Sequence, residues 1–188
     1  MCGRYNFTIE QNDEVLEILE KLNAKLQGKE VRTGEIFPTN LAPILREENH
    51  EASPTLSIWG FPKFDGKGVI INARSETAFE KKTFRDSLLN RRCIIPSTGF
   101  YEWDSEKRKF LFSLEGTNTL YMAGLYSYYG DELRYVILTT EANDSMKEVH
   151  NRMPLIIEKR DISTWIMDHR ATNDFLHKVS PQLIREAV

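Results

Sequence analysis

The segment Arg92–Trp103, "RCIIPSTGFYEW", decides the fold that the sequence predicts. It is a short run, rich in isoleucine and aromatic residues, which is typical of a strand-forming segment. Three runs of the same character follow: "KFLFSLEG" at 109–116, "LYMAGLYSYYG" at 120–130 and "ELRYVILTTEA" at 132–142. Because short turn signals separate these runs, the middle of the chain is expected to form a meander of consecutive antiparallel strands.

Helical patterns lie on both sides of these strands. Residues 8–28 have an amphipathic pattern, and Thr8 with Gln11 resembles a capping box. A second helix is expected over 75–90 with Ser75 as its N-cap, and short helices over 161–168 and 172–179. The sequence therefore predicts one α+β domain over residues 1–188. Its mixed or antiparallel barrel-like sheet is flanked by helices, and the last part, about 160–188, is helical.

Composition excludes several classes of protein. The 188 residues are 40% hydrophobic and 28% charged, which excludes a disordered or fibrous chain. No apolar run has the length of a membrane span and no signal segment is recognisable, so we expect a cytoplasmic protein without a membrane partner. The net charge of −3 gives no general attraction to nucleic acid, so DNA binding would need a local basic patch.

Cys2 is the first candidate for chemistry. If Met1 is removed, the mature chain begins with an amine and a thiol on adjacent carbon atoms. Such an aminothiol can condense with an aldehyde to an imine and close to a thiazolidine, or act as an N-terminal nucleophile in acyl transfer. The alternative is that Cys2 is an accidental second residue.

Three further segments carry polar candidates. Asn72 and Arg74 lie two residues apart on an extended segment, so they share one face, although an ordinary turn would look the same. Glu102 lies among aromatic residues, where burial would raise the pKa of a carboxyl group, or else on the wet face of an edge strand. His150 and Arg152 flank a predicted helix-to-strand turn, where histidine suits proton exchange, although a lone histidine is more often structural.

Aromatic residues beside glycine and proline form a further candidate surface. Trp59 and Phe61 flank Gly60, and Pro38 follows Phe37 in a second such segment. They are interpreted either as strand ends in the core or as an exposed wedge on which bases stack. No metal-ligand motif and no glycine-rich phosphate loop is present, so no metal or other cofactor is expected.

Five of these segments, taken in order, resemble one family. They are M-C-G-R at 1–4, W-G at 59–60, N-A-R-x-E at 72–76, R-C-x-x-P-x-x-G-F-Y-E-W at 92–103 and H-x-R-M-P at 150–154. This order is similar to that of the SRAP family, the SOS-response-associated peptidase-like proteins, whose bacterial and animal members shield abasic sites in single-stranded DNA. The resemblance covers residues 2–154.

The resemblance implies a role for each candidate. Cys2 would attack the ring-opened aldehyde of an abasic deoxyribose and form a thiazolidine crosslink to DNA. Asn72 would hydrogen-bond the opened sugar, Glu102 would deprotonate the α-amine, and His150 would act as general acid and base on the sugar hydroxyl. The remaining implied contacts are to DNA: Arg4, Arg74 and Arg152 to flanking phosphates, and Trp59, Phe61 and Pro38 to the splayed strand.

The implied activity is therefore a covalent, lyase- or hydrolase-like reaction in the DNA damage response, with single-stranded DNA as the partner of a monomer. We expect the protein to be associated with the nucleoid when engaged. A thiol-dependent peptidase that uses Cys2, including self-removal of Met1, is the alternative. A non-covalent DNA-binding module is a third hypothesis.

Overall fold

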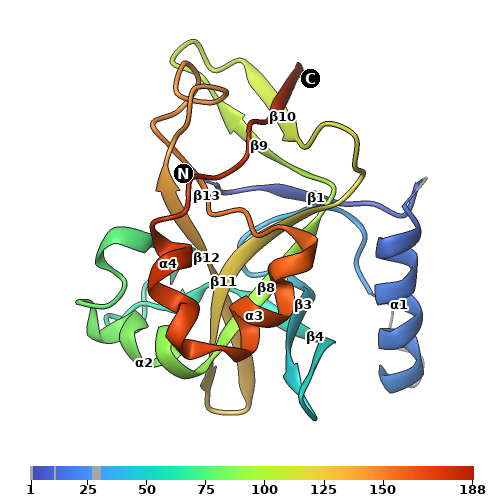
Figure 1. The fold of residues 1–188 in the computed structure, drawn as a ribbon, viewed down its shortest axis with the longest axis vertical. Helices are drawn as coiled ribbons and strands as arrows, with labels where there is room; N and C mark the ends of the chain where they lie inside the picture. Colours follow the sequence, from blue (N-terminus) through green and yellow to red (C-terminus); the bar gives the residue numbers. More distant parts are fainter. Residues whose placement is uncertain (1, 11, 27–30) are drawn as a thin grey trace.

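A closed five-stranded barrel forms the centre of the molecule (Figure 1). The computed structural model describes residues 2–10, 12–26 and 31–188. In order round the barrel, the strands are β11 (Leu120–Tyr129), β8 (Arg92–Ser97), β3 (Leu41–Glu48), β4 (Glu51–Trp59) and β12 (Glu132–Glu141). All neighbouring pairs are antiparallel except β4 and β12, which are parallel and join Trp59 to Tyr135. The predicted α+β fold with a barrel-like mixed sheet is therefore confirmed.

Strand β8 is buried on both faces, which explains its almost unbroken apolar run. One face lies inside the barrel, and helix α3 (Ile162–Met167) covers the other. The indole Nε1 of Trp165 donates a hydrogen bond of 2.8 Å to the carbonyl oxygen of Cys93. Cys93 is therefore a core residue, as expected for a free cysteine on a central strand.

A second sheet continues directly from the barrel. Its strand order is β14 (Ile184–Ala187), β10 (Lys109–Ser113), β9 (Gly99–Trp103), β1 (Tyr5–Phe7) and β2 (Gly34–Ile36). The 92–103 segment contributes to both sheets. Strand β8 ends at Ser97 in the barrel, and after Thr98 the chain continues as β9 in the second sheet. In Figure 1, β9 and β10 lie toward the upper end of the barrel, so the chain start that pairs with β9 is held at this end.

Strand β12 is extended on both edges beyond the barrel. Strand β7 (Asn72–Arg74) pairs with it in parallel, and β13 (Arg152–Pro154) pairs with it on the other edge. A hairpin of β5 (Phe61–Pro62) and β6 (Val69–Ile70) leads into β7. Gly60 is required before this hairpin, because its φ is +113° and a Cβ there would lie 2.7 Å from the Cβ of Val69.

The helices agree with the expected positions and differ in their ends. Figure 1 shows α1 (Asp13–Leu26) to the right of the barrel, α2 (Lys82–Asn90) to the left and α3 in front of β8. The side chain of Asn12 caps α1 by accepting from the amide of Val15, whereas Thr8 is hydrogen-bonded to Thr98. The expected capping box is therefore wrong for Thr8; its partner Gln11 and the expected helix end at Gly28 lie outside the described residues.

The helix expected over 75–90 is interrupted. A 3-10 turn, η1 (Ser75–Thr77), precedes α2 (Lys82–Asn90), whose N-cap is Lys81. Ser75 is therefore not the expected cap. The last part of the chain contains η2 (Lys159–Asp161), α3, η3 (His169–Ala171), α4 (Thr172–Leu176) and then β14. The strand at the end differs from the helical expectation, because residues 184–187 pair with the open edge of β10.

Candidate functional site

The chain start is held between two strands that are distant in sequence. The amide of Tyr101 on β9 donates to the carbonyl oxygen of Arg4 at 2.9 Å. The Nδ2 group of Asn72 on β7 donates to the carbonyl oxygen of Cys2, also at 2.9 Å. Strand β9 therefore holds the backbone at Arg4, and strand β7 holds it at Cys2.

The Cys2 thiol is buried, with 1% of the residue exposed. Burial raises the pKa of this thiol well above its ordinary value, and the carboxylate of Glu102 raises the pKa further. The carboxylate that exerts this effect belongs to a residue that is itself only 5% exposed. At neutral pH the sulfur therefore keeps its proton, so the thiol is a poor first nucleophile in this conformation.

Asn72 has one amide atom in use and one available. Its Nδ2 is bound to Cys2, whereas its buried Oδ1 has no hydrogen-bond partner among the described residues. A buried acceptor without a donor is unfavourable by about 1–3 kcal/mol, so this atom is suited to a hydroxyl or amine of a bound molecule.

His150 and Arg152 lie beside the other edge of β12. The backbone amide of Arg152 donates to Nδ1 of His150 at 2.9 Å. The guanidinium of Arg152 binds both carboxylate oxygens of Glu76, at 2.6 and 2.9 Å, and the carbonyl oxygen of Thr139 at 2.6 Å. Because Glu76 lies in η1, directly after β7, these contacts join the segment of His150 to the segment that carries Asn72.

The three predicted phosphate-binding arginines differ in their surroundings. Arg74 is exposed. Arg4 is half-buried and pairs with Glu35 at 3.3 Å. Arg152 is buried and bound to Glu76, so in this conformation its guanidinium is not presented to a phosphate. Burial alone would raise the pKa of Glu76, but the hydrogen bonds from Arg152 outweigh it and hold this pKa below its usual range.

The expected exposed wedge of Trp59 and Phe61 is wrong for this structure. Both side chains are fully buried. Trp59 stacks on Tyr135 with ring centroids 6.2 Å apart and donates its Nε1 to the carbonyl oxygen of Ile71. Tyr135 in turn shares a 2.7 Å hydrogen bond with Tyr5, so these rings form a buried support near the chain start. Pro38 is half-buried in the turn between β2 and β3.

Sequence reasoning missed an exposed aromatic residue three positions after Phe61. Phe64 is fully exposed in the turn between β5 and β6, with Lys63 and Lys67 exposed in the same turn. The signal was the stretch "KFDGK", in which one aromatic residue lies between lysines in a glycine-containing turn. Trp59 and Phe61 are more prominent in the sequence because they flank a glycine. That glycine, Gly60, allows the backbone to turn while it packs against Val69.

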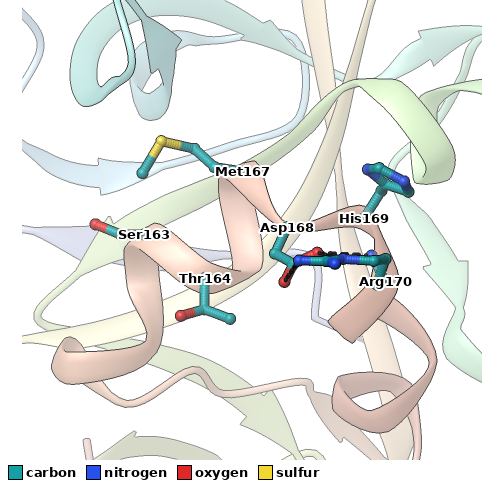
Figure 2. Close-up of a pocket in the computed structure, with 6 residues that line it drawn as sticks. All are labelled: Ser163, Thr164, Met167, Asp168, His169 and Arg170. Carbon is teal, nitrogen blue, oxygen red and sulfur yellow. Dashed lines mark hydrogen bonds and ion pairs between the residues drawn. The ribbon is translucent and has the colours of Figure 1, made fainter.

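A surface hollow over α3 and η3 lies apart from these residues (Figure 2). It is lined by Ser163, Thr164, Met167, Asp168, His169 and Arg170. Asp168 and Arg170 pair with each other beside it, with 3.2 Å between the Arg170 Nε and Asp168 Oδ1 atoms. None of the predicted site residues lines this hollow, so it is separate from the candidate site.

Two kinds of feature are absent from the described residues. Across 2–10, 12–26 and 31–188, there is no cluster of three or more histidine, cysteine or acidic side chains that could hold a metal ion. In the same part of the chain, no helix combines the length and the apolar character needed to cross a bilayer.

The fold is that of solved bacterial proteins with a barrel of this kind. One from Bacteroides thetaiotaomicron is 19% identical, with a TM-score of 0.82, and the match covers 100% of this chain and 92% of that one. Another, from Bordetella bronchiseptica, is 24% identical with a TM-score of 0.77, over 100% and 99% of the two chains. These likenesses confirm the fold class.

The chain belongs to the SRAP family, SOS response associated peptidase, whose family model matches residues 1–186. Among curated relatives, YoqW of Bacillus subtilis is 33% identical over 95% of this chain and 86% of its own length. YoaM of the same organism is 37% identical over 95% and 85%. YedK of Escherichia coli is 25% identical over 88% and 79%. All three are named abasic site processing proteins.

Proposed function

We propose that this protein processes abasic sites in single-stranded DNA by forming a covalent bond through Cys2, once Cys2 is the first residue of the mature chain. The observation that carries the proposal is the convergence of Asn72 and Glu102 on Cys2, one on its carbonyl oxygen and the other on the charge environment of its thiol. Relatives that are 33% and 37% identical over 95% of this chain are abasic site processing proteins, which supports the same substrate class here.

The reaction follows from the chemistry of an aminothiol and an aldehyde. The closed sugar opens to an aldehyde, and the neutral α-amine adds to its carbon. Loss of one water gives an imine. The thiol then adds across the carbon–nitrogen double bond, with sulfur bonding to carbon and the proton going to nitrogen, which closes a thiazolidine. The buried, protonated state of the thiol orders the steps: the amine attacks first and the sulfur second.

Two titratable side chains would handle the protons. Glu102 would accept the proton of the α-ammonium group and stabilise the cationic imine. Nδ1 of His150 lies 2.9 Å from the amide nitrogen of Arg152 and 3.2 Å from its carbonyl oxygen. In the tautomer that accepts from this amide, the neutral ring carries its proton on Nε2. His150 would donate from Nε2 to the sugar ring oxygen during opening. Asn72 would accept from the opened sugar through Oδ1 while it holds Cys2 through Nδ2.

DNA contacts would come from residues around this centre. Arg74 and Arg4 would bind phosphates, and Phe64 with its neighbouring lysines would stack on a base of the flanking strand. Arg152 would act as a positioning residue by holding His150 and Glu76. Trp59 and Phe61 would support the chain start from the core, and Pro38 would border the strand.

The test is a crosslinking assay with a matched pair of cysteine variants. The wild type is mixed with single-stranded DNA that carries one abasic site and is separated on a denaturing gel. Intact mass should equal the chain from Cys2 plus the oligonucleotide minus one water. Cys2→Ala should abolish the adduct, whereas Cys93→Ala, at the other cysteine, should retain it. If Cys2→Ala crosslinks as well as the wild type, the proposal is wrong; Cys2-dependent peptide hydrolysis without an adduct would favour the peptidase.

A further inference from the structure

A single carboxylate connects two cations close to the chain start. Glu35 on β2 accepts a hydrogen bond of 2.8 Å from Nζ of Lys109 on β10. Its other oxygen lies 3.3 Å from Nη1 of Arg4. The strand order β10, β9, β1, β2 means that Lys109 reaches across two strands to this carboxylate, and its Nζ lies 3.9 Å from the centre of the Tyr101 ring on the way.

The two cations are held in place by aromatic rings as well as by Glu35. The Cζ atom of Arg4 lies 4.4 Å from the ring centre of Phe37 and 5.1 Å from that of Trp103. Tyr101 supports Lys109 in the same way. Ring contacts of this kind fix the position of a cation without using its hydrogen-bond donors. Arg4 and Lys109 can therefore stay in position when the Glu35 carboxylate moves away from them.

The Glu35 contacts are weak enough to exchange. The side chains of Arg4, Glu35 and Lys109 are 30%, 33% and 24% exposed, so solvent screens both ion pairs. Arg4 also has a buried Nε without an acceptor among the described residues. A phosphodiester brings a full charge and several acceptor oxygens, which suit a guanidinium and an ammonium group together.

We propose that Arg4 and Lys109 form a subsite for a DNA backbone phosphate and that Glu35 is the internal competitor which this phosphate displaces. The inference rests on the proposed function, and it adds two residues, Lys109 and Glu35, that no sequence motif indicated. Arg4 is two residues from Cys2, and Tyr101 precedes Glu102. The phosphate bound here would therefore belong to a nucleotide next to the lesion.

The consequence is that Glu35 weakens DNA binding. Glu35→Gln should tighten binding of an undamaged, fluorescently labelled single strand by roughly 3–10-fold, because two screened ion pairs no longer have to be broken. Lys109→Gln should weaken binding, and the gain from Glu35→Gln should shrink in the double variant because the two residues are coupled.

Glu48→Gln is the matched control, because it also removes one carboxylate of an exposed ion pair, with Lys25, on a different part of the surface. The subsite is wrong if Glu35→Gln binds no more tightly than the wild type, if Glu48→Gln gives the same gain, or if Lys109→Gln binds as the wild type does. Melting curves of each variant check folding. Because binding is measured on undamaged DNA and crosslinking on abasic DNA, a failed subsite with an intact Cys2 adduct is distinguishable from a failed adduct with an intact subsite.

Discussion

Asn72→Ala separates positioning of the nucleophile from binding of DNA. The substitution removes the 2.9 Å hydrogen bond to the carbonyl oxygen of Cys2, a residue that is 1% exposed. A buried carbonyl left without a donor is unfavourable by about 1–3 kcal/mol. If the reacting conformation of Cys2 is destabilised by this amount, the crosslinking rate should fall by roughly 5–150-fold, since 1.36 kcal/mol corresponds to a factor of ten in rate.

The assay is single-turnover crosslinking at saturating abasic DNA, followed on denaturing gels. Affinity for an undamaged strand should be unchanged, because Asn72 is buried beside Cys2 and is not one of the residues proposed to bind phosphates or stack on bases. Asn72→Asp is the companion variant: it keeps an acceptor and removes the donor, so it should be at least as slow as Asn72→Ala. The reasoning is refuted if Asn72→Ala crosslinks within about twofold of the wild type, since even 0.5 kcal/mol would give more than that.

Three further predictions concern the surroundings of the site. Phe64→Ala should weaken binding of undamaged single-stranded DNA by the loss of one stacked base, about 1–3 kcal/mol, whereas Tyr128→Ala, at another exposed aromatic residue, should not; equal effects in a fluorescence titration would contradict the assignment. The crosslinking rate should rise with pH through the ordinary range of an α-amine, about 7.7–8.0, because the amine attacks first; a rise confined to much higher pH would instead indicate thiolate attack. Glu76→Gln should lower stability by about 1–2 kcal/mol above pH 6, since it leaves the buried Arg152 without its carboxylate. The pKa of Glu76 is depressed in the fold, so its contribution is present above the pKa of the unfolded chain and lost as pH falls through the folded value; melting curves of the two proteins should converge in acid.

The sequence predicted the strands well because their signals are local. Each of the four strand-forming runs contains a strand in the structure, and Arg92–Trp103, expected as one run, is divided into β8 and β9. Closure of the barrel was harder to predict from the sequence, because it depends on the parallel pairing of Trp59 with Tyr135, which are far apart in the chain. Whether an aromatic side chain is buried also depends on distant parts of the chain. Trp59 and Phe61 are enclosed, whereas Phe64, three residues after Phe61, is exposed.

Local sequence patterns also could not predict the electrostatic environment of the candidate site. Arg152 is a free-looking cation in the sequence, but Glu76 binds it across a separation of 76 residues. Arg4 and Lys109 share Glu35 only because four strands bring them together. Motif order identified the residues near Cys2, but the state of each charge depends on partners that only the fold supplies.

The pairing of β1 with β9 has a consequence for biosynthesis. Cys2 is enclosed by residues that are translated much later: Asn72 and then Glu102. At about 5–20 residues per second, the ribosome needs roughly 5–20 s to make the first hundred residues. Until the end of that interval, β2 is available to pair with one edge of β1, but β9, which pairs with its other edge, has not been completed. The removal of Met1 that the proposed function requires would therefore have seconds in which to occur before residues 72 and 102 enclose Cys2.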